Sequence, residues 1–210
     1  MKFDQQMLRL YAVTDRRWLS GRSLEDVIEE ALAAGITMVQ LREKHMDPEQ
    51  FLKEACSLRV LCHRYHVPLL IDDSPEICLR SGADGVHVGQ DDMSVQKARA
   101  LLGPDKIIGA TAHNVAEALM AERLGADYLG CGAAFGSHTK ENARPIDRST
   151  YHDITSAVHI PVCAIGGITE ENIGELRHLG LSGVAVISGI FASDQIGASC
   201  RKLLRLSSRL

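Results

Sequence analysis

Eight short apolar runs, spread along the chain, constrain most strongly what this sequence can fold into. They span residues 8–15, 38–44, 67–73, 85–90, 106–113, 128–135, 161–168 and 183–190. Near-continuous apolar runs are typical of strands that are buried on both faces of a parallel sheet, whereas strands with one wet face alternate between apolar and polar residues. The runs therefore predict eight strands of a parallel sheet.

Amphipathic stretches between the runs predict helices. Residues 24–35, 48–65 and 115–126 carry apolar side chains at helical spacing. Counted along the chain, each predicted strand is followed by a predicted helix, and right-handed crossovers close such a sheet after eight strands. The predicted fold is an α/β single (β/α)8 TIM barrel over residues 1–210, with a doubly wound open sheet as the second choice.

A repeated turn supports the barrel. The segments 82–85 (GADG) and 125–128 (GADY) share one pattern, and residues 180–183 (GLSG) repeat it more loosely. Glycine commonly ends a helix, so the pattern predicts one type of helix-to-strand turn that is used three times. No linker or low-complexity run divides the chain, which favours one domain.

Composition excludes several classes of partner. A formal net charge of -4 argues against a nucleic-acid surface, which needs a concentrated basic face. The six cysteines are scattered without a zinc-site spacing, as expected for reduced thiols in a cytoplasmic protein. No apolar stretch resembles a signal peptide or a membrane span, so we expect no membrane partner. The oligomeric state stays open, and a homo-oligomer is one alternative.

Charged residues gather where the predicted strands end. A TIM barrel places its functional groups at the C-terminal ends of its strands. There, Arg42, Lys44 and Lys140 are cations suited to phosphate oxygens. Asp73 and Asp92 follow two neighbouring predicted strands, so their carboxylates could share one divalent ion. Mg²⁺ is the favoured ion, because it often takes one or two protein carboxylates and completes its shell with water and phosphate.

Glycines follow the last two predicted strands, at Gly166-Gly167 and Ser188-Gly189. In this fold the loops after strands seven and eight often bind phosphate through backbone amides. The rim thus predicts two anion sites: a cation-rich site with a metal, which suits a diphosphate, and an amide-lined site, which suits a monophosphate.

Each of these features also has a plainer interpretation. A glycine pair is common in tight turns, Arg42 and Lys44 could be solvated rim charges, and the two aspartates could be helix N-caps. His87, inside a predicted strand, is interpreted as a hydrogen-bonded core residue, whereas His113 and His138 lie on the rim as candidate contacts. No motif supports a nucleophilic mechanism, and Cys131 is expected to be buried.

Several motifs resemble those of the thiamine-phosphate synthase family. They are QLREK (40–44), IDD (71–73), GADGVHVGQDD (82–92), HTK (138–140), AIGGI (164–168) and GVAVIS (183–188). They follow one another in the order and spacing of that family from about Tyr11 to Ile190. QLREK and GADGVHVGQDD are the most specific of them.

The resemblance implies a transferase that works on small-molecule substrates. Members join 4-amino-2-methyl-5-hydroxymethylpyrimidine diphosphate to 4-methyl-5-(2-phosphoethyl)thiazole, which gives thiamine phosphate and diphosphate. It also implies a dissociative mechanism in which Mg²⁺ and cations stabilise the leaving diphosphate and the thiazole nitrogen captures the carbocation.

The resemblance further implies a role for each matching residue. Arg42, Lys44 and Lys140 would stabilise the leaving group, and Asp73 and Asp92 would hold Mg²⁺. The residues expected to contact substrate are Gln40, Leu41, Arg42, Glu43, Lys44, Asp72, Thr111, Ser137, His138, Thr139, Lys140, Gly166, Gly167, Ile187 and Ser188.

The chain departs from the family pattern at three places. Asp72 stands where the family usually has asparagine, which adds a negative charge beside an anionic substrate. The loop GAAFGSHTK lacks the two prolines of the usual GPxFPTxTK, and Thr111 replaces a serine. These departures keep two alternatives open: a thiazole tautomerase, which is an isomerase on the same barrel, and a barrel that binds thiamine precursors without turning them over.

Overall fold

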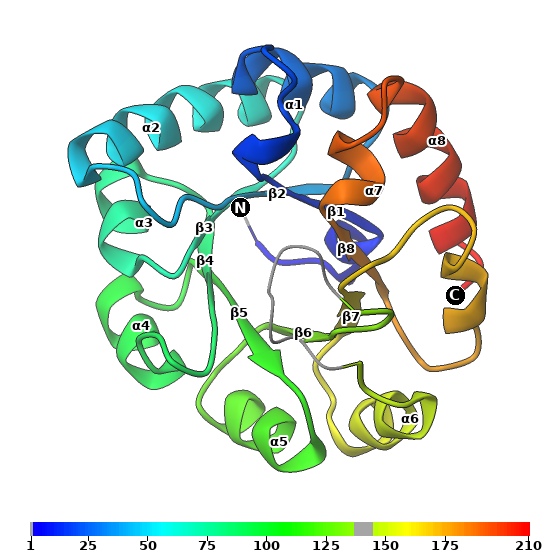
Figure 1. Cartoon of the computed structure of the whole chain (residues 1–210). Helices are drawn as coiled ribbons and strands as arrows, with labels where there is room; N and C mark the ends of the chain where they lie inside the picture. The colour runs from blue at the N-terminus through cyan, green and yellow to red at the C-terminus, as the bar shows by residue number, and fades with distance from the viewer. Residues whose placement is uncertain (1, 137–144) are drawn as a thin grey trace.

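The computed structural model describes residues 2–136 and 145–210, which form a closed barrel of eight parallel strands (Figure 1). The strands pair in chain order, and β8 pairs with β1, with Leu10 opposite Val184. The predicted (β/α)8 TIM barrel is confirmed, and the doubly wound open sheet was the wrong alternative. The strands are β1 Leu10–Val13, β2 Met38–Leu41, β3 Leu69–Asp72, β4 Gly85–Val88, β5 Ile107–Ala112, β6 Tyr128–Gly132, β7 Val162–Ile165 and β8 Gly183–Val186.

Helices form a ring outside the strands (Figure 1). The described α-helices are α1 Leu24–Ala33, α2 Pro48–Arg64, α3 Pro75–Ser81, α4 Val95–Leu102, α5 Val115–Arg123, α6 Arg148–Ala157, α7 Ser188–Phe191 and α8 Ile196–Ser207. The short 3-10 helices are η1 Gln5–Leu8, η2 Arg16–Trp18 and η3 Ile173–Leu176. Side-chain caps begin several helices; for example, the Ser23 hydroxyl accepts from the amide of Asp26. None of the described helices is long and apolar enough to cross a membrane.

After β7 the predicted helix is present only as a short 3-10 segment. Between β7 and β8 the described chain forms only η3, which has four residues. Gly174 lies inside this segment, and Arg177 adopts an extended backbone that ends it. Glycine lowers helix propensity by about 1 kcal/mol, so the short segment does not extend into an α-helix.

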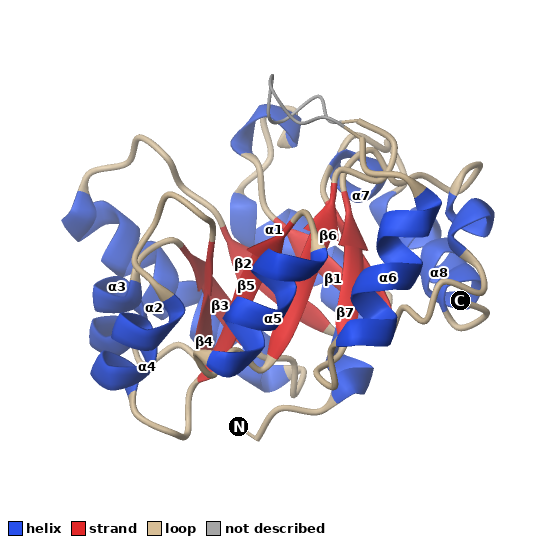
Figure 2. Cartoon of the chain, turned by 90° about the horizontal axis from the view of Figure 1, so that it is seen from below, coloured by secondary structure: helices blue, strands red, loops and turns tan. Residues whose placement is uncertain are grey.

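The core has two layers, because successive strand residues point to opposite faces. Along β1, Leu10 and Ala12 pack outward against the helices, whereas Tyr11 and Val13 point into the barrel. The N-terminal segment lies at one end of the barrel (Figure 2). There the Phe3 ring stacks on Tyr128, with 5.7 Å between ring centroids. This end is therefore filled, and the opposite end, where the strands finish, is available for a site.

The predicted helix-to-strand turn is present, and its aspartates explain the pattern. Gly82 and Gly125 have φ values of +72° and +95°, which glycine adopts without steric cost. The Asp84 carboxylate accepts from the amide of Leu69 (2.9 Å), and Asp127 accepts from that of Ile108 (2.7 Å). Each aspartate thus ties its turn to the neighbouring strand. All six cysteines are free thiols, and Cys131 is buried as predicted.

Candidate active site

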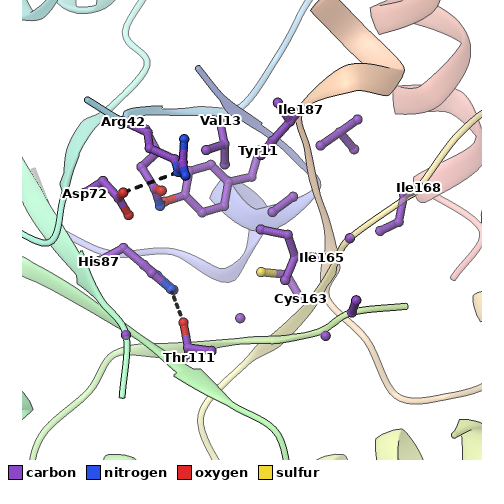
Figure 3. Close-up of a pocket in the computed structure, with 18 of the residues that line it drawn as sticks. Tyr11, Val13, Arg42, Asp72, His87, Thr111, Cys163, Ile165, Ile168 and Ile187 are labelled. Carbon is purple, nitrogen blue, oxygen red and sulfur yellow. Dashed lines mark hydrogen bonds and ion pairs between the residues drawn. The ribbon is translucent and has the colours of Figure 1, made fainter. Parts of the chain in front are cut away.

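A cavity opens at the C-terminal ends of the strands, and most of the predicted site residues line it (Figure 3). This is the end of the barrel at which a (β/α)8 fold places its functional groups. The predicted residues that line the cavity are Gln40, Arg42, Lys44, Asp72, Asp73, Asp92, Thr111, Gly166, Gly167, Ile187 and Ser188.

Among the described residues, two of the predicted contacts, Leu41 and Glu43, do not line this cavity. The Leu41 side chain is fully buried in the outer layer, because Gln40 points inward and the next residue must point outward. Glu43 forms an ion pair with Arg16 (2.7 Å) beside the cavity. Contact of Leu41 and Glu43 with a substrate stays a prediction. Ser137, His138, Thr139 and Lys140 lie outside the described residues.

Cations and carboxylates meet on the rim at the ends of β2 and β3. The Lys44 ammonium lies 2.9 Å from Asp72 Oδ2 and also contacts the Asp73 carboxylate. The Arg42 guanidinium lies 3.7 Å from the same Asp72 oxygen. Burial lowers the pKa of Lys44, but the charge of Asp72 and the hydrogen bond to Asp73 outweigh it, so the net pKa is raised. Lys44 therefore stays charged at neutral pH.

Asp72 points toward the two cations and not away from the cavity. Its side chain is only 10% exposed. Its Oδ2 atom makes ion pairs but no hydrogen bond of good geometry with any described residue. The extra negative charge thus offsets part of the positive charge of Arg42 and Lys44.

Asp73 and Asp92 come together from neighbouring strands. Asp73 follows β3 directly with φ at +60°, a left-handed conformation that aspartate tolerates better than most residues. Asp92 accepts from the amide of Gly89 (2.8 Å). Burial and a hydrogen bond with Asp73 raise the pKa of Asp92, since two adjacent carboxylates resist a second charge. Such a pair favours a shared proton or a cation.

Neither aspartate is a helix N-cap. Ser74 caps α3 by accepting from the amide of Ile77, and Ser94 caps α4 by accepting from that of Lys97. The plainer interpretation of Asp73 and Asp92 is therefore wrong, and both carboxylates are available to the cavity.

The opposite side of the cavity is built from glycine turns. Gly166 and Gly167 have φ values of +103° and +65°. A Cβ atom on Gly166 would meet Ala133 Cβ at 2.7 Å, so this glycine is required for close packing of the turn. The Asn172 side chain holds the turn by donating to the Gly167 carbonyl (2.8 Å). Ser188 begins the short helix α7 beside it.

Sequence reasoning missed most of the cavity floor. Tyr11, Val13, Cys163 and Ile165 line it and point inward (Figure 3). His87 is buried and hydrogen-bonded, as predicted for a core residue, yet it also lines the cavity. The missed signal is the alternation of side chains along a strand, in which residues i and i+2 share a face. Counting back in steps of two from an inward-facing rim residue would have identified the floor residues of the same strand.

The rim histidine His113 lines the cavity as predicted. Its Nδ1 atom lies 2.9 Å from a carboxylate oxygen of Glu117, one helical turn further on. Burial raises the pKa of Glu117, but hydrogen bonds from the His113 backbone amide and ring outweigh it, so the net pKa is lowered. The other rim candidate, His138, lies outside the described residues.

Comparison with known proteins gives one consistent result. A sequence model of a family described as thiamine monophosphate synthase matches residues 10–190. Thiamine-phosphate synthase from Clostridium acetobutylicum is 47% identical over 193 residues, which is 92% of each chain. That from Chloroflexus aurantiacus is 47% identical over 201 residues, which is 95% of this chain and 93% of the relative. The solved thiamine phosphate pyrophosphorylase from Pyrococcus furiosus superposes with a TM-score of 0.89 at 34% identity and covers 97% of both chains.

Proposed function

Since the chain belongs to the thiamine monophosphate synthase family of transferases, we propose that it joins a pyrimidine and a thiazole in this cavity. The substrates are 4-amino-2-methyl-5-hydroxymethylpyrimidine diphosphate and 4-methyl-5-(2-phosphoethyl)thiazole, and the products are thiamine phosphate and diphosphate. The methylene-to-oxygen bond of the pyrimidine breaks, its electron pair leaves with diphosphate, and the thiazole nitrogen forms the new bond to the methylene carbon.

One observation carries this proposal: the cavity has charged groups on one side and glycine turns on the other. Arg42, Lys44 and the carboxylate pair lie at the ends of β2 to β4, whereas Gly166, Gly167 and Ser188 lie after β7 and β8. A diphosphate needs strong charge neutralisation, and a phosphate monoester can be held by backbone amides. The two substrates carry these two groups.

Asp73 and Asp92 fit a magnesium ion. Their carboxylates are adjacent, and the Lys44 ammonium already contacts Asp73, so a positive charge is stabilised there. No cluster of three or more His, Cys, Asp or Glu residues that could hold a metal occurs in residues 2–136 and 145–210. Mg²⁺ matches this sparse set, because it commonly takes one or two carboxylates together with water and substrate phosphate. When bound, it would neutralise negative charge on the diphosphate.

Arg42 and Lys44 have the main role in the dissociative mechanism. Their charges stabilise the diphosphate as its negative charge grows, and both groups are already oriented by contacts with Asp72. The Arg42 backbone amide donates to Thr14 (2.9 Å), which holds the loop at the rim. No proton transfer is required, since diphosphate is a stable anion.

The cavity floor suits an aminopyrimidine ring. Gln40, His87 and Thr111 offer hydrogen-bonding groups, and Val13 and Ile165 offer apolar surface. A heteroaromatic ring with an amino group and ring nitrogens needs this combination of flat apolar contact and a few polar groups. We place the pyrimidine there, with its diphosphate toward the rim.

The remaining contacts are proposed for the thiazole phosphate. Gly166, Gly167, Ile187 and Ser188 would hold its phosphate through the glycine turn and the start of α7. From the loop outside the described residues, Ser137, His138 and Thr139 would join them, and Lys140 would bind the diphosphate. We further propose a cytoplasmic location, in keeping with the six free thiols.

Diphosphate release tests the proposal. Purified protein is given both substrates with and without Mg²⁺, and thiamine phosphate is detected in parallel. Synthesis that requires the metal and both substrates supports the proposal. Conversion of the thiazole phosphate alone without metal would point to a tautomerase, and binding without turnover would point to a precursor-binding barrel; either result would overturn the proposed reaction.

A further inference from the structure

Five polar side chains form one hydrogen-bonded chain across the barrel interior. Gln40 Nε2 donates to the Tyr11 hydroxyl, which lies 3.0 Å from that of Tyr128. The Tyr128 hydroxyl lies 3.0 Å from His87 Nδ1, and His87 Nε2 lies 3.1 Å from Thr111 Oγ1. Four of the five residues line the cavity, whereas Tyr128 lies beneath it and is fully buried. Tyr128 therefore links the two sides of the cavity from below.

Gln40, at one end of this series of hydrogen bonds, sets the donor-to-acceptor direction of the whole series. An amide nitrogen can only donate, so the Tyr11 oxygen accepts from Gln40. Among the described residues, the Tyr11 proton then has the Tyr128 oxygen as its acceptor, and the Tyr128 proton has His87 Nδ1. A neutral imidazole whose Nδ1 accepts carries its proton on Nε2.

Burial keeps both phenols able to donate. It raises the pKa of Tyr11 and of Tyr128 well above the ordinary value, mainly because a buried phenolate is poorly solvated. Both hydroxyls are therefore protonated at neutral pH. Each hydroxyl therefore accepts one hydrogen bond and donates another, so the donor-to-acceptor direction is the same from Gln40 to His87.

The strands leave space for this arrangement. A Cβ atom on Gly109 would lie 2.2 Å from Tyr128 Cζ and 2.5 Å from His87 Nδ1. A Cβ atom on Gly130 would lie 3.1 Å from His87 Cε1. Glycine at position 109 in β5 is therefore required for both rings, and glycine at position 130 in β6 leaves close but sufficient space for His87.

We propose that the Tyr128 hydroxyl is a positioning group, which holds His87 in the Nε2-protonated tautomer and thereby makes Thr111 a hydrogen-bond donor to the pyrimidine substrate. Because Thr111 Oγ1 accepts from His87 Nε2, its own proton is directed to an acceptor atom in the cavity. The reverse tautomer would draw the Thr111 proton toward His87 and present only a lone pair. The hydrogen bond from Thr111 to the pyrimidine rests on the proposed function, whereas the His87 tautomer does not.

The tautomer is tested without any substrate. Two-bond ¹H–¹⁵N correlation spectra of histidine-labelled protein distinguish the two neutral forms, and His87→Gln assigns the signal among the nine histidines. We expect the Nε2-protonated form in the unmodified chain and a mixture of forms in Tyr128→Phe. The control is Tyr151→Phe, which removes another buried hydroxyl that donates to a backbone carbonyl (2.9 Å, Cys131). It should cost similar stability and leave the His87 signal unchanged.

Kinetics tests whether Tyr128 acts through Thr111. We expect Tyr128→Phe to lower kcat/KM about tenfold, the effect of one well-placed hydrogen bond. Thr111→Val should cost at least as much, whereas Thr111→Ser should retain most activity. In the Thr111→Val background, Tyr128→Phe should have little further effect.

Three results would overturn the inference. They are an Nδ1-protonated His87 in the unmodified chain, an unchanged tautomer in Tyr128→Phe, and a kcat/KM of the Tyr128→Phe/Thr111→Val double variant that is reduced by the product of the two single losses. Failure of the proposed function is distinguishable, because it would abolish thiamine phosphate synthesis while the expected tautomer and its change in Tyr128→Phe remained.

Discussion

The Lys44 ammonium lies 2.9 Å from a carboxylate oxygen of Asp72, where β2 and β3 leave the barrel. The same oxygen faces the guanidinium of Arg42 at 3.7 Å. An anionic substrate that binds both cations must therefore compete with a carboxylate that the protein itself supplies. This arrangement explains how the chain accommodates aspartate at a position where the resemblance leads one to expect asparagine.

Replacing Asp72 by asparagine should strengthen diphosphate binding. The change removes a negative charge next to the proposed diphosphate site and keeps the size of the side chain, so we expect KM for the pyrimidine diphosphate to fall about threefold to tenfold, equivalent to roughly 1 kcal/mol. Steady-state kinetics at fixed Mg²⁺ measures this. Asp147→Asn, an exposed change whose side chain makes no helix-capping hydrogen bond, is the control. A higher KM with a greater need for Mg²⁺ would show instead that Asp72 binds the metal.

Asp73 and Asp92 should together determine the response to magnesium. Asp92→Asn removes one of two proposed carboxylate ligands, so we expect kcat/KM to fall on the order of a hundredfold and the Mg²⁺ concentration for half-maximal rate to rise. Removal of metal by a chelator should abolish turnover of the unmodified chain. Asp91→Asn, at the exposed neighbouring residue, is the matched control. Full activity of Asp92→Asn at low Mg²⁺ would contradict the assignment.

The rim of the site could be predicted from the sequence, because charged residues that directly follow buried strands can only lie at the strand ends. Lys44 and Asp92 were found in this way, and both line the cavity. The floor could not be predicted by the same argument. Tyr11 and Tyr128 lie inside continuous apolar runs, where both faces are buried and composition does not separate inward from outward residues.

Leu41 shows how the missing information could be recovered. Its neighbour Gln40 points inward, so the alternation of a strand requires Leu41 to face the helices. Applied to β1, the same alternation groups Tyr11 with Val13. The hydrogen bonds that connect these inward groups depend on the register of the closed barrel, and no local pattern of residues encodes that register.

Gly166→Ala should destabilise the protein and weaken binding of the thiazole phosphate. The new methyl group would meet Ala133 Cβ at 2.7 Å, and the backbone has φ at +103°. We expect a loss of about 2 kcal/mol or more in the free energy of unfolding and a higher KM for the thiazole phosphate. Urea unfolding and steady-state kinetics measure the two effects. Gly174→Ala has open space and no positive φ, so it should be neutral or slightly stabilising; equal effects of both variants would contradict the steric argument.

Glu30 should make the contact between α1 and α8 sensitive to acid. Its pKa is lowered, mainly because the Gly197 amide donates to its carboxylate (2.9 Å), with a further contribution from Arg22 and some opposition from burial. A carboxyl group whose pKa is lower in the folded state stabilises the fold above its unfolded pKa of about 4.3, and this stabilisation is lost as the pH falls through the folded pKa.

Glu30→Gln should therefore lower the free energy of unfolding by about 0.5–1 kcal/mol at neutral pH, a small value because the Arg22 pair is solvent-exposed. The difference from the unmodified chain should shrink as the pH falls through the folded pKa of Glu30. Urea unfolding at a series of pH values measures it, and Glu76→Gln, on the exposed surface of α3, is the control. A difference that stayed constant down to the lowest pH at which the protein folds would show that Glu30 acts through packing and not through its charge.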